Sequence, residues 1–234
     1  MDAISFVNQE IMKLWETCEK ELRSVNKYLP IPLIYNSMER DVLLFIGSNP
    51  SFIPDKWVKI LKKTNFKDIP PEFFLNWSNR ADFGIDEYQA FEKEIRKERP
   101  YFSVFEKISE DVGVKWEHID LFFYRKTKQN DFKKQIYQNE DLSGFVRSQL
   151  ALSKKLIYEV QPKVIVVANK FASDIFREEF DLKWDKEWGY YLAYFESRSI
   201  PVFLASMLSG QRAMDVYSRE RLIWHIKKAL KHFA

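Results

Sequence analysis

The sequence predicts an α/β fold: a three-layer α/β/α sandwich with a mainly parallel, four-stranded central sheet, formed as a single domain over residues 1–234. Short apolar runs alternate along the chain with helical patterns, which is typical of right-handed βαβ crossovers. The runs are apolar throughout, as in strands that helices cover on both faces. With 234 residues, of which 46% are hydrophobic, the chain is long enough and apolar enough to bury the core of a single domain of this kind.

The elements follow in chain order, beginning with an amphipathic helix that ends before Pro30 and Pro32. Its apolar residues recur at steps of three and four: Ile4, Val7, Ile11, Leu14, Cys18 and Leu22. The predicted strands are 42–46, 119–123, 164–168 and 202–205, and the helical patterns are 86–96, 101–112, 141–160, 171–180 and 216–233. We also expect an added strand at 188–195, antiparallel and at an edge, and a lid or pocket wall in the irregular region 64–85.

Composition limits the compartment and the partners. The single cysteine, Cys18, excludes an intramolecular disulfide and favours a reducing compartment, and its place in the helical pattern predicts a core position. No stretch approaches the roughly 20 apolar residues of a spanning helix, and the amino end lacks the pattern of a signal peptide. We therefore expect a cytoplasmic protein without a membrane partner. The net charge of +3 is too small to indicate a nucleic-acid partner by itself.

Polar loops follow the predicted strands, and open parallel sheets bind ligands beyond the carboxyl ends of their strands. The first loop is Gly47-Ser48-Asn49-Pro50-Ser51. Its glycine permits a tight turn, and its hydroxyl groups and backbone donors suit an anion or a sugar. An ordinary strand-to-helix turn with Asn49 as a local cap explains the same residues equally well.

The second and third loops each contain one candidate residue. Asp120 lies inside an apolar run, where a carboxylate is costly unless it is paired. It is either a residue that recognises a ligand or a carboxylate that pairs with Arg125 or caps a turn. Asn169 follows the third strand, and we favour it as a helix N-cap over a substrate contact.

The fourth loop runs from Leu204 to Arg212 and reads Leu204-Ala205-Ser206-Met207-Leu208-Ser209-Gly210-Gln211-Arg212. Together with the first loop, it resembles the uracil-DNA glycosylase superfamily. That family has a G-x-[DN]-P motif after its first strand and an H-P-S motif, often extended to L-S-x-x-R, after its last. The resemblance runs from about residue 40 to the carboxyl end and implies a uracil-DNA glycosylase-like fold.

The resemblance also implies a role for each matching residue. Asn49 would position or activate water at the anomeric carbon of the sugar, and Asp120 lies near the position of an asparagine that recognises the base edge. The substrate would further contact Gly47, Ser48, Pro50, Ser51, Asn169 and Leu204. The DNA-binding loop would contain the phosphate contacts Ser206, Ser209 and Arg212, the wedge residues Met207 and Leu208, and Gly210 and Gln211.

Two residues depart from the family pattern. Leu204 stands where the family has the histidine that stabilises charge on the departing base, and leucine donates no hydrogen bond. His118 is expected to precede a strand, while His225 and His232 lie on the last helical pattern as surface or packing residues. Asp120 departs because an ionised carboxylate only accepts hydrogen bonds, which suits the donors of guanine or a related purine better than uracil.

Two functions remain open. One is a DNA-repair-like protein that recognises a modified base in DNA and hydrolyses its glycosidic bond or only binds it. The other is a catalytically inactive module of the same fold that binds a nucleotide, DNA or a protein. No metal-ligand cluster, P-loop or nucleophile motif occurs in the sequence, so we expect no cofactor. DNA is the expected partner, and two groups of cations would contact it unless they only form a solvated surface: Lys56, Lys59, Lys62 and Lys63, and Arg125, Lys126, Lys128, Lys133 and Lys134.

Overall fold

The chain divides into two compact units in the computed structural model, which describes residues 3–195, 198–210 and 213–233. The helical unit comprises Met1–Met38, Asn49–Arg99 and Phe122–Leu156. The sheet unit comprises Glu39–Ser48, Pro100–Leu121 and Ile157–Ala234. The organisation as one domain over residues 1–234 stays a prediction.

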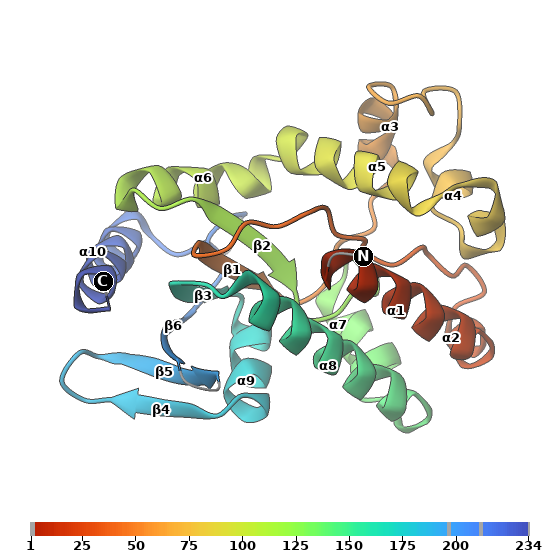
Figure 1. Ribbon diagram of the computed structural model, residues 1–234. Coiled ribbons are helices and arrows are strands. Elements are labelled where there is room, and N and C mark those ends of the chain that lie inside the picture. The colour runs from red at the N-terminus through yellow and green to blue at the C-terminus, as the bar shows by residue number, and fades with distance from the viewer. Residues whose placement is uncertain (1–2, 196–197, 211–212, 234) are drawn as a thin grey trace. The chain divides into compact units, whose positions relative to one another are not determined.

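The sheet unit contains six strands in the order β2-β1-β3-β6-β5-β4, among the residues described (Figure 1). Their bounds are β1 (Leu43–Gly47), β2 (Trp116–Asp120), β3 (Val164–Ala168), β4 (Leu182–Asp185), β5 (Tyr190–Phe195) and β6 (Arg198–Ala205). Strands β2, β1, β3 and β6 are parallel, β5 is antiparallel to β6, and β4 is antiparallel to β5. The α/β class is confirmed, but the sheet is six-stranded and mixed, not four-stranded.

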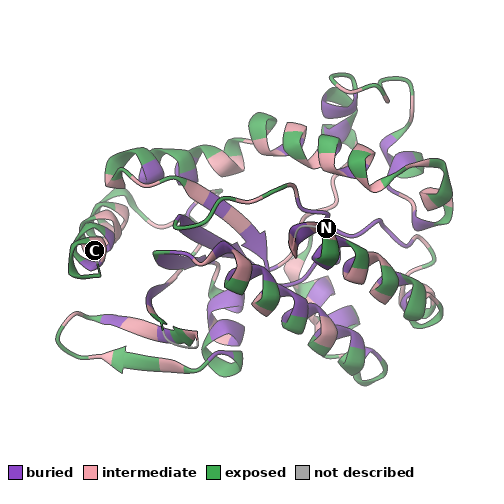
Figure 2. Ribbon diagram, viewed as in Figure 1, coloured by how far each residue is buried: buried purple, intermediate pink, exposed green. Residues whose placement is uncertain are grey.

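The antiparallel pair explains the difference. The segment 188–195, predicted as an antiparallel edge strand, contains β5. The edge position is instead taken by β4, a strand of four residues in which Lys183 is exposed. So short a segment, half charged, carries no apolar run that would mark it as a strand. Figure 2 shows the contrast with the central strands β1 and β3, in which every residue is buried.

Helices cover both faces of the sheet within this unit (Figure 1). On one face, α6 (Pro100–Val112) and α10 (Val216–His232) pack on a core in which Phe45 stacks on Phe105 at 4.4 Å between ring centroids. On the other face lies α9 (Lys170–Glu179). Its Ser173 hydroxyl donates to the carbonyl oxygens of Val167 and Ala205 at 3.4 and 3.1 Å, which fastens α9 beside the carboxyl ends of β3 and β6.

The helical unit is built from short helices around aromatic side chains. Its elements are α1 (Ala3–Thr17), α2 (Glu19–Val25), α3 (Pro54–Leu61), α4 (Pro71–Phe74), α5 (Ile85–Glu98), α7 (Gln129–Phe132), most of α8 (Ser143–Val160), and the short turns η1 (Trp77–Asp82), η2 (Lys133–Tyr137) and η3 (Glu140–Leu142). Trp15 meets Phe145 edge to face at 4.9 Å. Arg125 is buried in an ion pair with Glu92, so it is a structural residue and not an exposed phosphate contact.

Two boundaries differ from the prediction. The first helical pattern forms α1 and α2 with Cys18 between them, so Cys18 is a partly exposed free thiol and not a core residue. Strand β2 ends at Asp120, whereas the prediction continued to Phe123. Residues 121–123 are buried, but they are not paired as a strand at Phe123. Its backbone N–H donates to the side-chain oxygen of Gln149 at 2.8 Å, whereas in a sheet it would donate to a backbone carbonyl of a neighbouring strand.

In the part of the chain that the structure describes, none of the helices combines the length and the apolar character needed to cross a bilayer.

Candidate ligand site at the carboxyl edge of the sheet

The carboxyl ends of the parallel strands form one row in the sheet unit. The register pairs Gly47 of β1 with Asp120 of β2, and Ala168 of β3 with Ala205 of β6. Because adjacent strands lie about 4.8 Å apart, the three steps from β2 to β6 span about 14 Å. A ligand the size of one nucleobase therefore meets one end of this row and not both.

The β2–β1 end of the row is tightly packed. The carboxylate of Asp120 lies directly against Gly47, where a Cβ atom would collide with its Oδ1. His118 Nε2 lies 3.9 Å from the same oxygen, and both side chains are only 9% exposed. The His118 ring stacks on Phe105 at 5.6 Å. At this end, Asp120 and His118 thus form a buried polar pair, and the ring of Phe105 packs on His118.

His118 is a candidate residue that the sequence interpretation set aside. It was expected before a strand, but it lies inside β2 and two residues from Asp120. Side chains at positions i and i+2 of a strand share a face, so this spacing was a usable signal. The imidazole of His118 lies next to the carboxylate of Asp120. The alternative that Asp120 pairs with Arg125 is not seen, because Arg125 pairs with Glu92.

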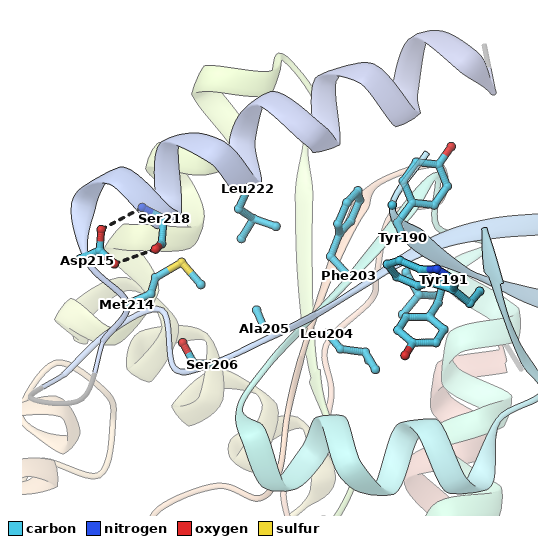
Figure 3. A pocket seen from close by; sticks show the side chains of 13 residues that line it. Tyr190, Tyr191, Phe203, Leu204, Ala205, Ser206, Met214, Asp215, Ser218 and Leu222 are labelled. Carbon is cyan, nitrogen blue, oxygen red and sulfur yellow. Dashed lines mark hydrogen bonds between the residues drawn. The ribbon is translucent and has the colours of Figure 1, made fainter. Parts of the chain in front are cut away.

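The β6 end of the row opens into a cavity of about 500 Å³ (Figure 3). Its walls come from the β4–β5 hairpin, the end of β6 and the start of α10. Four aromatic side chains line it: Trp184, Tyr190, Tyr191 and Phe203. Leu204 and Ser206, two residues of the family-like loop, also lie in the wall.

One wall of this cavity carries the polar N-cap of α10. The two oxygens of Asp215 accept from the backbone N–H and the hydroxyl of Ser218, at 2.9 and 2.6 Å (Figure 3). Hydrogen bonds from Ser218 lower the pKa of Asp215 below its ordinary value. The start of α10 therefore presents a fixed carboxylate to the cavity mouth.

A second cavity, of about 370 Å³, lies beside the same strand end. Four residues line both cavities: Tyr191, Leu204, Ala205 and Ser206. In Figure 3 the side chains of Tyr191 and Leu204 point toward α9, whereas those of Phe203 and Ala205 point toward α10. The α9 side is charged: Lys170 pairs with Asp174 at 3.0 Å, and Arg177 is a further lining residue. The end of β6 is thus accessible from both faces of the sheet.

Tyr190 places a polar atom in the aromatic wall. The residue is 2% exposed and its ring lies 5.4 Å from that of Phe203. Within the described ranges its buried hydroxyl has no hydrogen-bond partner. Burial, and then the nearby charge of Asp185, raise the pKa of Tyr190, so the phenol stays neutral at neutral pH.

The first motif is split between the two units: Gly47 and Ser48 belong to the sheet unit, and Asn49, Pro50 and Ser51 to the helical unit. The amide nitrogen of Asn49 donates to the carbonyl oxygen of Lys126 at 2.8 Å, and Ser51 accepts from Arg99 at 2.8 Å. Helix α3 begins at Pro54 without a side-chain cap. Asn49 therefore joins two loops and is not the local cap of that helix.

The fourth loop contains both exposed and buried residues. Leu208 is 3% exposed and belongs to the core of the sheet unit, so it does not project as a wedge, while Met207 is partly exposed. Ser206 and Gly210 are exposed and Ser209 is partly exposed. The predicted contacts Gln211 and Arg212 lie outside the described residues.

Asn169 is confirmed as an N-cap, because its side-chain oxygen accepts from the backbone N–H of Ala172 at 3.2 Å at the start of α9. Among the residues that the structure describes, no cluster of three potential metal ligands occurs.

Comparison with known proteins assigns no family. No model of a protein family matches the chain, and no curated protein is similar enough to count as a relative.

Proposed function

We propose that the protein recognises a nucleobase in nucleic acid, in the manner of the uracil-DNA glycosylase superfamily that its two loop motifs resemble. The observation that carries the proposal is the cavity of about 500 Å³ at the end of β6, with Leu204 of the second motif in its wall. Its volume lies in the range of small-ligand sites. The exposed ring of Trp184 and the partly exposed ring of Tyr191 lie 4.9 Å apart and suit a flat heterocycle, because stacking holds any base by its π-face.

Base release is the reaction that this site would perform if it is catalytic. The bond between the base nitrogen and the anomeric carbon breaks, the oxygen of water adds to that carbon, and a proton goes to the base. Leu204 cannot stabilise the charge on the departing base, and loss of one such donor costs on the order of 100- to 1000-fold in rate. We therefore propose slow release. The water-positioning role of Asn49 rests on the resemblance alone.

Base recognition without cleavage is the second candidate, and two observations favour it. Leu204 leaves the cavity without a donor at the family's histidine position, and the Asn49 amide nitrogen already donates to the carbonyl of Lys126. In that case the protein is a binding module that uses the same cavity.

Asp120 is a competing hypothesis for the residue that sets base preference, and it would place the base at the β2–β1 end instead of the β6 end. Its acceptor oxygens suit an edge with donors, such as that of guanine. That hypothesis competes with the cavity at β6, because the Asp120 side chain is 9% exposed and packed against Gly47. If a base does contact Asp120, its preference depends on that carboxylate. Asp120→Asn, which adds a donor, should then shift preference toward bases with carbonyl groups.

The test is a panel of matched oligonucleotides, each with one modified base, assayed for binding and base release at fixed salt. We expect preference for at least one modified base, and we expect Ser206→Trp, which fills the cavity mouth, to abolish it. Ser103→Trp, at an exposed serine of α6, is the matched control and should keep the preference. Equal binding of all modified and unmodified strands, without release, would overturn the proposal.

A further inference from the structure

The outward side of α10 combines exposed aromatic rings with positive charge. Tyr217 is 74% exposed and Trp224 is 56% exposed, one above the other at positions i and i+7. We define the α10 outer face as these two residues with their exposed neighbours at helical spacing: Glu220, Arg221, Lys227, Lys228 and Lys231. It therefore holds four cations and one acid.

We propose that the α10 outer face binds single-stranded nucleic acid. Two kinds of group recur there within one helix length, and a single strand needs both: rings on which bases stack and cations that neutralise phosphates. Lys228 Nζ lies 5.2 Å from the centroid of the Trp224 ring, so a charge and a stacking surface are adjacent. The rings are exposed rather than recessed, so they accept bases that are already unpaired.

The opposite side of α10 argues against a lipid surface. Its apolar residues are already used in the core, where Ile226 and Ala229 are completely buried. A helix that lies in a membrane needs a free apolar face to insert among the acyl chains. The α10 outer face offers only two rings among charges, which favours a polyanion with stackable groups.

This surface is separate from the base-binding cavity, and the inference does not need the proposed function to hold. The cavity is lined by Ser218 and Leu222 of α10 and by its N-cap Asp215, none of which belongs to the outer face. If both proposals hold, the outer face would retain a strand while a base enters the cavity.

The experiment measures the affinity of the full chain for oligothymidine over a range of salt concentrations. Trp224→Ala and Tyr217→Ala should each weaken binding about 5- to 150-fold. Lys228→Gln with Lys231→Gln should lower the slope of log affinity against log salt by about 0.7 for each phosphate that the protein no longer neutralises. Glu220→Gln, which removes the one acid, should strengthen binding.

Matched controls carry the same changes on other surfaces of the sheet unit. Tyr194→Ala on β5 and Lys107→Gln on α6 replace exposed residues and should leave affinity unchanged. Thermal unfolding of every variant shows that each is folded. Unchanged affinity in both aromatic variants, preference for duplex DNA that is insensitive to Trp224→Ala, or binding to anionic phosphatidylserine vesicles without binding to oligothymidine would each overturn the inference.

Discussion

The two ends of the carboxyl edge differ in what surrounds their polar residues. At the β2–β1 end, Asp120 and His118 are packed against Gly47 and the rings of α6. At the β6 end, Leu204 and Ser206 border open space on both faces of the sheet. The end whose strand itself carries ionisable side chains, Asp120 and His118, is therefore the closed one. Polar residues at a strand end mark a binding site only where the structure leaves room for a ligand.

The largest expected effect comes from placing a donor at the open end. Leu204→His would put an imidazole in the cavity wall, and we expect base release to rise by about 100-fold or more. Asn49→Ala in that background should lower it again. Oligonucleotide cleavage assays, run with thermal unfolding, measure both. A folded Leu204→His protein with no gain on any strand that the wild type binds would reject the positional match to the family histidine.

The closed end should respond by losing stability. In Gly47→Ala, the new Cβ collides with the carboxylate of Asp120, so either that buried group or the strand end must shift. Overpacking of this kind costs about 1–3 kcal/mol of unfolding free energy, measured by urea denaturation. Gly144→Ala is the control, since a Cβ there meets nothing within 4 Å, and in helix α8 it should stabilise by about 0.5–1 kcal/mol. Equal stability of Gly47→Ala and wild type would show that this end is not closed.

Between the two ends, Asn169 tests whether the β3 loop is structural. Asn169→Ala removes the side-chain acceptor of the Ala172 N–H and should cost about 1 kcal/mol. Asn169→Asp keeps an acceptor at the cap and should keep the stability. If instead both variants lost base binding while unfolding like the wild type, Asn169 would be a ligand contact.

The smallest effect concerns the cavity wall. Tyr190→Phe removes a buried hydroxyl for which no partner occurs in the described part of the chain, so the unfolding free energy at neutral pH should stay the same or rise, by up to about 1 kcal/mol. Since the folded pKa of Tyr190 is raised, wild-type stability is full below about pH 10, the ordinary tyrosine value, and falls as pH rises through the folded pKa. The variant should lose less stability on this alkaline limb. A loss at neutral pH would reveal a hydrogen bond to this hydroxyl.

The strands that could be predicted from sequence are those buried on both faces. Strand β3 matches its apolar run, and β1 differs by one residue at each end. Strand β2 was placed too late because buried residues 121–123 continue the apolar pattern beyond the ladder. A continuous apolar run indicates burial whether or not the backbone is paired in a sheet. The run alone therefore does not show where strand pairing ends, which depends on the neighbouring elements.

The site was predictable where a motif follows a strand directly. Leu204 and Ser206 were candidates, and both line the cavity. Trp184, Tyr191 and Asp215 were missed because they come from an antiparallel hairpin and a helix start that only the sheet order brings to β6. Leu208 was predicted as a DNA contact, but it is a core residue of the sheet unit, and an apolar residue in a loop motif gives no sign of which of the two roles it has.

The central claim is that a base enters at the β6 end of the edge, and photo-cross-linking tests it most directly. An oligonucleotide that contains a photoreactive base is irradiated in complex with the protein, and the adducts are located by mass spectrometry. We predict adducts on Trp184 or Tyr191, whose rings lie 4.9 Å apart in the cavity wall, and their loss in Ser206→Trp. Adducts confined to His118 or to Tyr101 beside it would place the base at the β2–β1 end and contradict the account.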